Sequence, residues 1–187
     1  LENNTIGLGK KKDCQNRSVV TTPTEIVKYM VDKTLSKVCD GKTPSEILDI
    51  SVADIACGSG IFLEEAFAYL QDYCVQWYIC NGQTDHLIET GIDLYKLPLQ
   101  EKKDILCSCI YGIDIDIHAV EVAKFSLLIK LIEDETAPSV SEVVPILPDL
   151  GDNIQFGNSL VSQTELNGIS GANHQMMEIA PFDWSTI

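Results

Sequence analysis

Three positions along the chain combine glycine or polar residues in a way that suits a nucleotide-like ligand. Gly58 and Gly60 follow one apolar stretch, Asp114 follows a second, and Asn158 follows a third. Glycines let a ligand approach the backbone and the N-terminus of a following helix, and a carboxylate at a strand end can accept both hydroxyls of a ribose. An amide can donate to and accept from the edge of an adenine. Together these residues predict a site for an adenosine-containing ligand.

A nicotinamide dinucleotide fits this spacing less well. The fingerprint for that ligand has a third glycine three positions after the second, but Gly60 is followed by Ile61, Phe62 and Leu63. Its acidic residue lies about 20 residues further on, whereas Asp114 lies more than twice as far from Gly60. The sequence therefore disfavours a dinucleotide site.

The elements that would carry these residues alternate between helices and strands. Thr22 as the capping residue, Pro23 at the first helical position and apolar residues at helical spacing predict a helix that ends near Cys39. Apolar runs predict strands over residues 47–56, 105–113 and 153–158, and helices over 61–80 and 119–132. The last helix is so apolar that most of its surface should be buried. Residues 85–97 are expected to form a further helix or a lid.

This alternation predicts an α/β fold, a partial Rossmann-like arrangement in which a parallel sheet has helices on both faces. Residues 1–20 are polar and lack a sustained period, so we expect a flexible N-terminal arm. The folded domain would cover residues 21–163, and residues 164–187 would form a polar loop.

The charge of the chain bears on its partners. The 187 residues include 28 acidic and 13 basic side chains, which give a formal net charge of −15. Such a chain repels phosphate polymers, and its one basic run, residues 10–12, is expected to be part of a solvated arm. If the protein binds DNA, most of the contact should come from other regions.

The cysteines do not predict a disulfide framework or a metal site. Seven cysteines occur without a Cys-x-x-Cys spacing, and several stand in apolar stretches. In a strand, Cys107 and Cys109 would lie on one face, but no second pair of ligands stands nearby. No apolar run is long enough to span a membrane, and no signal peptide opens the sequence, which predicts a soluble, cytoplasmic protein.

Four segments resemble the motifs of adenine-specific DNA methyltransferases. Residues 54–63, Asp-Ile-Ala-Cys-Gly-Ser-Gly-Ile-Phe-Leu, resemble the motif of this family that binds S-adenosylmethionine (SAM), which usually reads Asp-Pro-Ala-Cys-Gly-Ser-Gly followed by Phe-Leu. Residues 111–120 are similar to the second motif, residues 153–160 to the third, and Thr22-Pro23 to the Tyr-Thr-Pro element upstream. The resemblance covers roughly residues 17–160. The enzymes that the chain resembles belong to bacterial restriction-modification systems, of type I or a type IIG-like organisation.

The resemblance implies a role for each candidate residue. Asp54 would engage the methionine amino group of SAM, Asp114 the ribose, Ile115 the adenine ring and Asn158 its amino edge. The backbone that would hold the methionyl end comprises Ala56, Cys57, Gly58 and Gly60, together with Thr22 and Pro23. Three of these side chains also have a structural alternative: Asp54 could cap the loop, Ile115 could belong to the core and Asn158 could stabilise a turn.

The catalytic Asn-Pro-Pro-Tyr motif of the family does not occur in this sequence, and proline is replaced at Ile55 and Ile117. No catalytic residue is therefore predicted. The sequence starts with Leu1, and we interpret it as the front part of a methyltransferase domain, truncated before that motif and inactive alone.

In the whole enzyme, the resemblance implies, a target adenine is flipped out of double-stranded DNA. Regions outside this chain would bind that DNA. A specificity or nuclease subunit, or a fused domain, would be a further partner. Loss of the fourth strand would expose a sheet edge and favour self-association. Two alternatives remain open at this point, namely a SAM-dependent methyltransferase of RNA or protein, and a noncatalytic assembly module with the same fold.

Overall fold

A computed structural model describes residues 22–136, 140, 143–162 and 180–184. In chain order the elements are α1 (Thr24–Cys39), α2 (Pro44–Ile47), β1 (Val52–Asp54), α3 (Ile61–Cys80), the 3-10 helix η2 (Thr84–His86), β2 (Ile88–Gly91), β3 (Leu94–Lys96), α4 (Leu99–Cys109), β4 (Ile110–Asp114), α5 (Ile117–Ile132) and β5 (Ile154–Phe156). The predicted N-terminal arm lies outside the described residues, as does most of the predicted C-terminal loop.

A parallel three-stranded sheet forms the centre of the fold. The strand order is β1-β4-β5, with Ala53 beside Tyr111 and Ile113 beside Gln155. The predicted α/β, Rossmann-like fold with a parallel sheet is confirmed. Within the described part of the chain β1 is an edge strand, whereas self-association through that edge stays a prediction.

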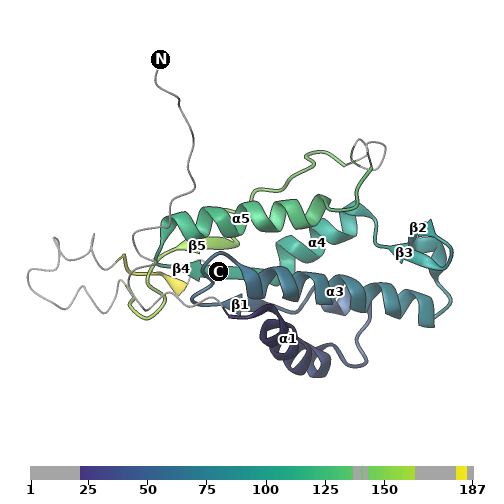
Figure 1. Cartoon of the computed structure of the whole chain (residues 1–187), viewed down its shortest axis with the longest axis horizontal. Helices are drawn as coiled ribbons and strands as arrows, with labels where there is room; N and C mark the ends of the chain where they lie inside the picture. The colour runs from purple at the N-terminus through teal and green to yellow at the C-terminus, as the bar shows by residue number, and fades with distance from the viewer. Residues whose placement is uncertain (1–21, 137–139, 141–142, 163–179, 185–187) are drawn as a thin grey trace, which may run out of the picture.

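Helices that are distant from one another in the sequence pack together over the sheet (Figure 1). Helices α3 and α5 run side by side, both contact β4, and α1 packs along α3. The core between them contains Val27 of α1, Phe67 and Leu70 of α3, Ile110 of β4 and Leu127 of α5, all fully buried. Among the described helices, none is long and apolar enough to cross a membrane.

The helix over residues 61–80 has the predicted limits, and α1 ends where the sequence predicted. The start of α1 was predicted wrongly: Pro23 is the N-cap residue, no side-chain hydrogen bond caps the helix, and Thr22 precedes it. A capping box forms instead at α2, where Thr43 Oγ1 accepts from the Glu46 N–H and the Glu46 carboxylate accepts from the Thr43 N–H.

Two predicted strands are shorter than expected because part of each apolar run is helical. Ile47 ends α2, so β1 starts only at Val52. Residues 99–109 form α4, whose buried positions Leu99, Lys102, Leu106 and Cys109 recur at helical spacing. Cys107 and Cys109 are therefore not on one strand face, and within the described residues no group of His, Cys, Asp or Glu could hold a metal ion.

Two other expectations are also corrected. Residues 85–97 do not form a long helix but contain an antiparallel hairpin of β2 and β3, which turns at Asp93 with a positive φ of 56°, whereas the alternative of a lid stays a prediction. Helix α5 buries only one face, since Val122, Phe125 and Ile129 are about half exposed or more. Hydrophobic composition alone did not show that the opposite face of α5 lacks a packing neighbour in the described chain.

Asn153 fixes the junction between α4 and β4. Its side-chain Nδ2 donates to the carbonyl oxygens of Cys107 and Ile110, at 2.8 and 2.9 Å, and the residue is only 6% exposed. The Gly112 N–H donates to the Asn153 carbonyl oxygen at 2.8 Å. Asn153 therefore satisfies the carbonyls where the helix ends and aligns β4, the strand that carries Asp114.

Candidate functional site

The three parallel strands end at one edge of the sheet, and their following loops meet there. The Cys57 N–H, in the loop after β1, donates to the Ile113 carbonyl oxygen at 3.0 Å. The Gly157 N–H, in the loop after β5, donates to the Asp114 carbonyl oxygen at 2.9 Å. The end of β4 thus anchors both outer loops. The candidate residues that the sequence placed at three strand ends are brought together at this edge.

The Asp114 carboxylate connects the glycine loop to the end of β4. Its Oδ2 accepts from the Gly58 N–H at 2.7 Å, and its Oδ1 accepts from the Asp116 N–H at 2.8 Å. A carboxylate offers about four acceptor positions, so these two bonds leave each oxygen able to accept one more donor. This geometry suits a ligand with two adjacent hydroxyls.

Asp54 has the loop-capping role that was considered for it. Its Oδ1 accepts from the Ala56 N–H at 3.0 Å, which shapes the first turn of the loop. A cavity of about 350 Å³ opens beside β1, and its wall includes Asp54, Ile55, Phe62 of α3 and Met30 of α1. The cavity places Asp54 next to open space, so the loop cap does not bury this carboxylate.

Gly58 and Gly60 both have positive φ angles, 54° and 91°, but differ in their surroundings. A Cβ at Gly60, the N-cap of α3, would lie 3.0 Å from Ala123 Cβ and 3.2 Å from Ala123 Cα in α5. A Cβ at Gly58 would meet nothing within 4 Å. Gly60 therefore allows close approach of α3 and α5, whereas Gly58 is required only by the backbone conformation.

We expect Gly60→Ala to destabilise the chain by about 2–4 kcal/mol, because left-handed strain of about 1–2 kcal/mol adds to overpacking against Ala123. Gly58→Ala, the matched control, should cost only the strain, about 1–2 kcal/mol. Urea unfolding of both variants measures the difference. Equal losses of stability would show that the contact between α3 and α5 tolerates a methyl group.

Ile115 and Asn158 lie at the same edge of the sheet, but Ile115 is exposed whereas Asn158 makes a side-chain hydrogen bond within its turn. Ile115 is 57% exposed, so the alternative that it belongs to the core is wrong. Asn158 Oδ1 accepts from the Leu160 N–H at 3.1 Å, which is the turn-stabilising role considered for it. An exposed isoleucine beside the Asp114 carboxylate offers an apolar surface to a flat ring.

Thr22 and Pro23 lie directly before α1. Thr22 is half-buried and Pro23 is exposed. Within the residues that the structure describes, neither makes a hydrogen bond to the glycine loop. The structure thus brings Asp54, the glycines and Asp114 together, but it does not join Thr22 and Pro23 to them.

The Cys57 thiol in the glycine loop is a packing group. It is 4% exposed, and burial, reinforced by the charges of Asp114 and Asp54, raises its pKa to about 12. A Cβ at Gly112 would lie 3.1 Å from its sulfur, so the thiol fills the space above β4. A neutral, buried thiol is not a nucleophile at neutral pH.

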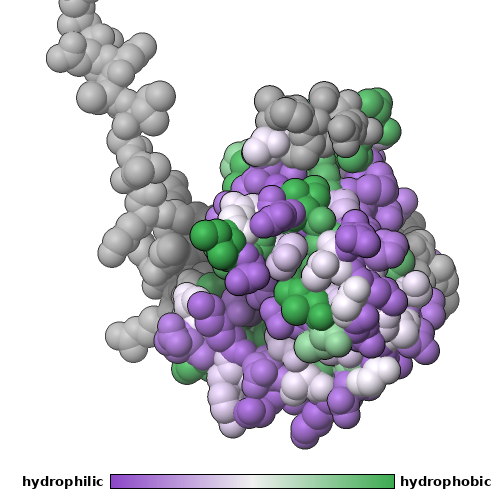
Figure 2. All heavy atoms as spheres, turned by 90° about the vertical axis from the view of Figure 1, so that its right-hand side faces the viewer, coloured by the Kyte–Doolittle hydropathy of each residue, from purple (hydrophilic) through white to green (hydrophobic). Residues whose placement is uncertain are grey.

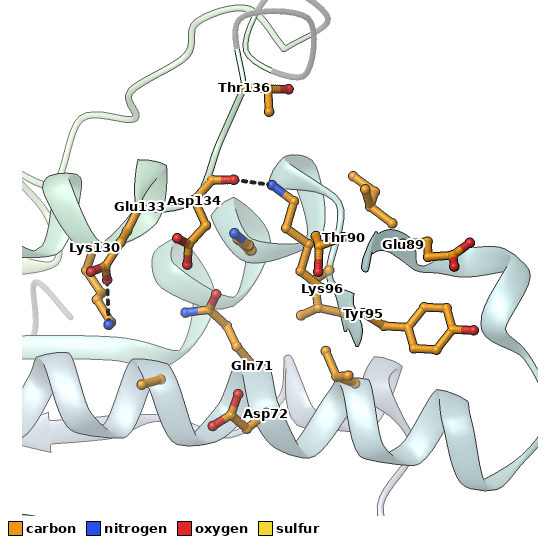
Figure 3. Close-up of a pocket in the computed structure, with 15 residues that line it drawn as sticks. Gln71, Asp72, Glu89, Thr90, Tyr95, Lys96, Lys130, Glu133, Asp134 and Thr136 are labelled. Atoms are coloured by element: carbon orange, nitrogen blue, oxygen red, sulfur yellow. Dashed lines mark hydrogen bonds and ion pairs between the residues drawn. The ribbon is translucent and has the colours of Figure 1, made fainter. Parts of the chain in front are cut away.

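A larger cavity lies away from the strand ends (Figure 3). Its volume is about 930 Å³, and its walls come from α3, the β2–β3 hairpin, α4 and the turn after α5. Lys96 reaches from the hairpin to the Asp134 carbonyl oxygen at 2.6 Å, and Lys130 pairs with Glu133 at 2.6 Å. The end of the molecule that carries the hairpin is mainly hydrophilic, with scattered hydrophobic residues (Figure 2). None of the predicted cofactor residues lines this cavity.

Known proteins match the part of the chain that contains the strand ends. The family model described as MmeI, DNA-methyltransferase domain, matches residues 36–170, which include the glycine loop, β4 and β5. The chain belongs to this family. The predicted resemblance to DNA methyltransferases is thereby confirmed, and the names of two relatives, each a restriction enzyme and methyltransferase, support the link to restriction-modification systems.

Two relatives of this methyltransferase domain are much longer proteins. The chain is 44% identical, over 92% of its length, to the type II restriction enzyme and methyltransferase RM.Eco57I of Escherichia coli. It is 34% identical, over 65% of its length, to the putative type II restriction enzyme and methyltransferase RM.MjaORFECS2P of Methanocaldococcus jannaschii. It spans 17% and 9% of these two proteins, respectively.

The sequence did not predict a hydrogen bond that joins two loops of the candidate site. Ser159 Oγ donates to the Ile55 carbonyl oxygen at 2.8 Å, across 104 residues of sequence. Ser159 lies within residues 153–160, which resemble the third motif, and no local pattern marks the residue that it contacts.

Proposed function

We propose that the chain binds S-adenosylmethionine at the carboxyl edge of its sheet and is the cofactor-binding part of a methyltransferase that acts on the exocyclic amine of adenine in DNA. The observation that carries the proposal is the pair of hydrogen bonds at Asp114, which holds the glycine loop beside the end of β4. The resemblance of residues 54–63 to the adenine-specific enzymes supports the choice of substrate.

The residues of the chain would hold SAM in a defined order along the sheet edge. Asp54, which borders the cavity beside β1, would accept from the methionine amino group. Asp114 would accept from both ribose hydroxyls, because two of its acceptor positions remain. Ile115, exposed beside it, would pack on the adenine ring, and Asn158 would contact the amino edge of that ring.

The backbone around the glycine loop would contact the methionyl end of SAM. Gly58 and Gly60, both left-handed, have no side chain to cover the loop, and Gly60 is the N-cap of α3, whose N-terminus favours negative charge. Ala56 and Cys57 contribute backbone groups to the same loop. Thr22 and Pro23, which precede α1, would contact the same end of SAM, as the resemblance of these residues to the Tyr-Thr-Pro element implies.

SAM, when bound, would supply the methyl group, and the residues of this chain would hold SAM. The sequence contains no Asn-Pro-Pro-Tyr, the motif that would hold the target adenine, so we propose that the 187-residue chain alone transfers no methyl group. Double-stranded DNA would be bound by regions outside the chain, in keeping with its net charge of −15. A nuclease or specificity element would be fused or associated.

Calorimetric titration of the chain with SAM tests this proposal, with nicotinamide dinucleotide as the matched control ligand. We expect saturable, one-to-one binding of SAM and no heat of binding from the dinucleotide. No binding of SAM, or equal binding of both ligands, would contradict the proposal. Incubation of the same protein with labelled SAM and duplex DNA should leave the DNA unlabelled, and label transfer would refute the inactivity of the isolated chain.

A further inference from the structure

Residues 180–184 contact the loop after β5, although the sequence predicted only a polar loop for this region. The Asn158 N–H donates to the Ala180 carbonyl oxygen at 2.6 Å, and the Phe182 N–H donates to the Val161 carbonyl oxygen at 2.9 Å. Phe182 is 4% exposed and covers Gly157, where a Cβ would lie 2.9 Å from its ring. Two backbone bonds and a buried aromatic ring therefore attach the segment to this loop.

Trp184 and Ser159 extend this contact to the loop after β1. The Trp184 indole Nε1–H donates to the Ser159 carbonyl oxygen at 3.1 Å, and the Ser159 hydroxyl donates to the Ile55 carbonyl oxygen at 2.8 Å. Strands β1 and β5 lie on opposite sides of β4 in the sheet. The bond between Ser159 and Ile55 therefore joins the two outer loops across the end of β4, where Asp114 lies.

We propose that Trp184, acting through Ser159, is a positioning residue of the cofactor site. The bond from Ser159 to Ile55 sets the distance between the loop after β1 and the loop after β5, and the bond from Trp184 holds Ser159 in the position from which it makes that bond. A ligand held at one end by Asp54 and at the other by Asn158 has to fit that distance. This role rests on the proposed function, because it requires SAM to bind between the two loops.

The surroundings of Trp184 allow its hydrogen bond to be removed with little other change. Its ring meets Phe182 edge to face, with centroids 5.2 Å apart, and the residue is 44% exposed. Phenylalanine at position 184 keeps most of this ring contact and removes the N–H. Ser159→Ala removes the hydroxyl that donates to the Ile55 carbonyl oxygen, and this hydrogen bond is exposed. Neither change leaves a large cavity, so effects on ligand binding can be separated from effects on folding.

The test is SAM affinity of the 187-residue chain by calorimetry for Ser159→Ala, Trp184→Phe and the double variant. We expect each single variant to bind SAM about two- to ten-fold more weakly, the range for loss of one hydrogen bond. Because Trp184 acts through Ser159, the two losses should not add. The SAM affinity of the double variant should therefore equal that of the single variant with the lower SAM affinity. Ser159→Thr, which retains a hydroxyl, should restore most of the affinity.

A matched control removes a hydroxyl bond to a carbonyl elsewhere. Thr90 Oγ1 donates to the Leu94 carbonyl oxygen at 3.2 Å in the hairpin, and Thr90→Val should leave SAM affinity unchanged.

The chain has two tryptophans, so Trp77→Phe leaves Trp184 as the single tryptophan fluorophore, and its emission should shift when SAM binds. Thermal unfolding of each variant measures any loss of fold.

The outcomes separate this inference from the proposed function. If the unaltered chain does not bind SAM, the proposed function fails and the positioning role fails with it. If the unaltered chain binds SAM and both single variants bind it equally well, only the positioning role is overturned. Additive losses in the double variant would show two independent structural contacts and would also overturn it.

Discussion

Asp114→Ala is expected to weaken SAM binding about 100-fold or more. The carboxylate would accept two ribose hydroxyls, and hydrogen bonds to a charged group contribute about 1.5–3 kcal/mol each. The variant also removes the acceptor of the Gly58 N–H, which is 2.7 Å from Asp114 Oδ2, so the glycine loop loses its link to β4. Calorimetric titration of the variant beside the unaltered chain measures the loss.

Asp114→Asn keeps the size of the side chain but removes its charge and one of its two acceptor oxygens. Both carboxylate oxygens accept backbone N–H groups, from Gly58 and Asp116, and an amide NH2 cannot accept at either position. We therefore expect the asparagine variant to lose most of the affinity as well. Asp116→Asn is the control, because the neighbouring N-cap side chain accepts from the His118 N–H of α5 and asparagine is an equally good cap. Unchanged SAM affinity in Asp114→Asn would exclude the carboxylate as the ribose acceptor.

Glu135→Gln should destabilise the chain by about 3 kcal/mol or more, because it leaves two lysines without their buried counter-charge. The Glu135 side chain is 1% exposed and pairs with Lys96 at 3.0 Å and with Lys102 at 2.7 Å. These lysines come from the hairpin and from α4, whereas Glu135 lies after α5. The expected fall in the melting temperature is roughly 10 °C for a chain of this size.

An exposed ion pair provides the control for the Glu135 prediction. Glu121 pairs with Lys124 within α5 at 3.3 Å, and its side chain is 67% exposed, so Glu121→Gln should change stability by less than about 0.5 kcal/mol. The double variant Lys102→Met/Glu135→Gln removes the more buried lysine and should be more stable than Glu135→Gln alone. A Glu135→Gln protein as stable as the unaltered chain would show that the three elements are joined by other contacts.

The helices were predicted best where local chemistry marks both ends. Helix α3 begins after Gly60, which is left-handed, and ends before Asn81-Gly82, so its limits follow from a few neighbouring residues. The C-terminal part of helix α4 was predicted as part of a strand because Ile105 and Leu106 run on into the apolar residues of β4. A short apolar run fits a buried helix and a buried strand equally, and packing on α3 and α5 decides between them.

The candidate site was predicted in its position but not in its internal contacts. The order of motifs placed Asp54, Asp114 and Asn158 at strand ends, and parallel strands bring those ends to one edge. The bonds from Gly58 to Asp114 and from Ser159 to Ile55 could not be predicted, because they join residues 56 and 104 positions apart. No periodicity or short motif specifies such pairs.

The sequence by itself determined the family, the parallel α/β fold and the set of loops that form the candidate site. These depend on local patterns, namely the glycine loop after an apolar run, the acid after the next one, and helical spacing between them. Only the tertiary structure decided which side chains meet, including Glu135 with Lys96 and Lys102, and Trp184 with Ser159. Backbone conformation follows largely from neighbouring residues, whereas contacts between distant segments depend on how complete elements pack against each other.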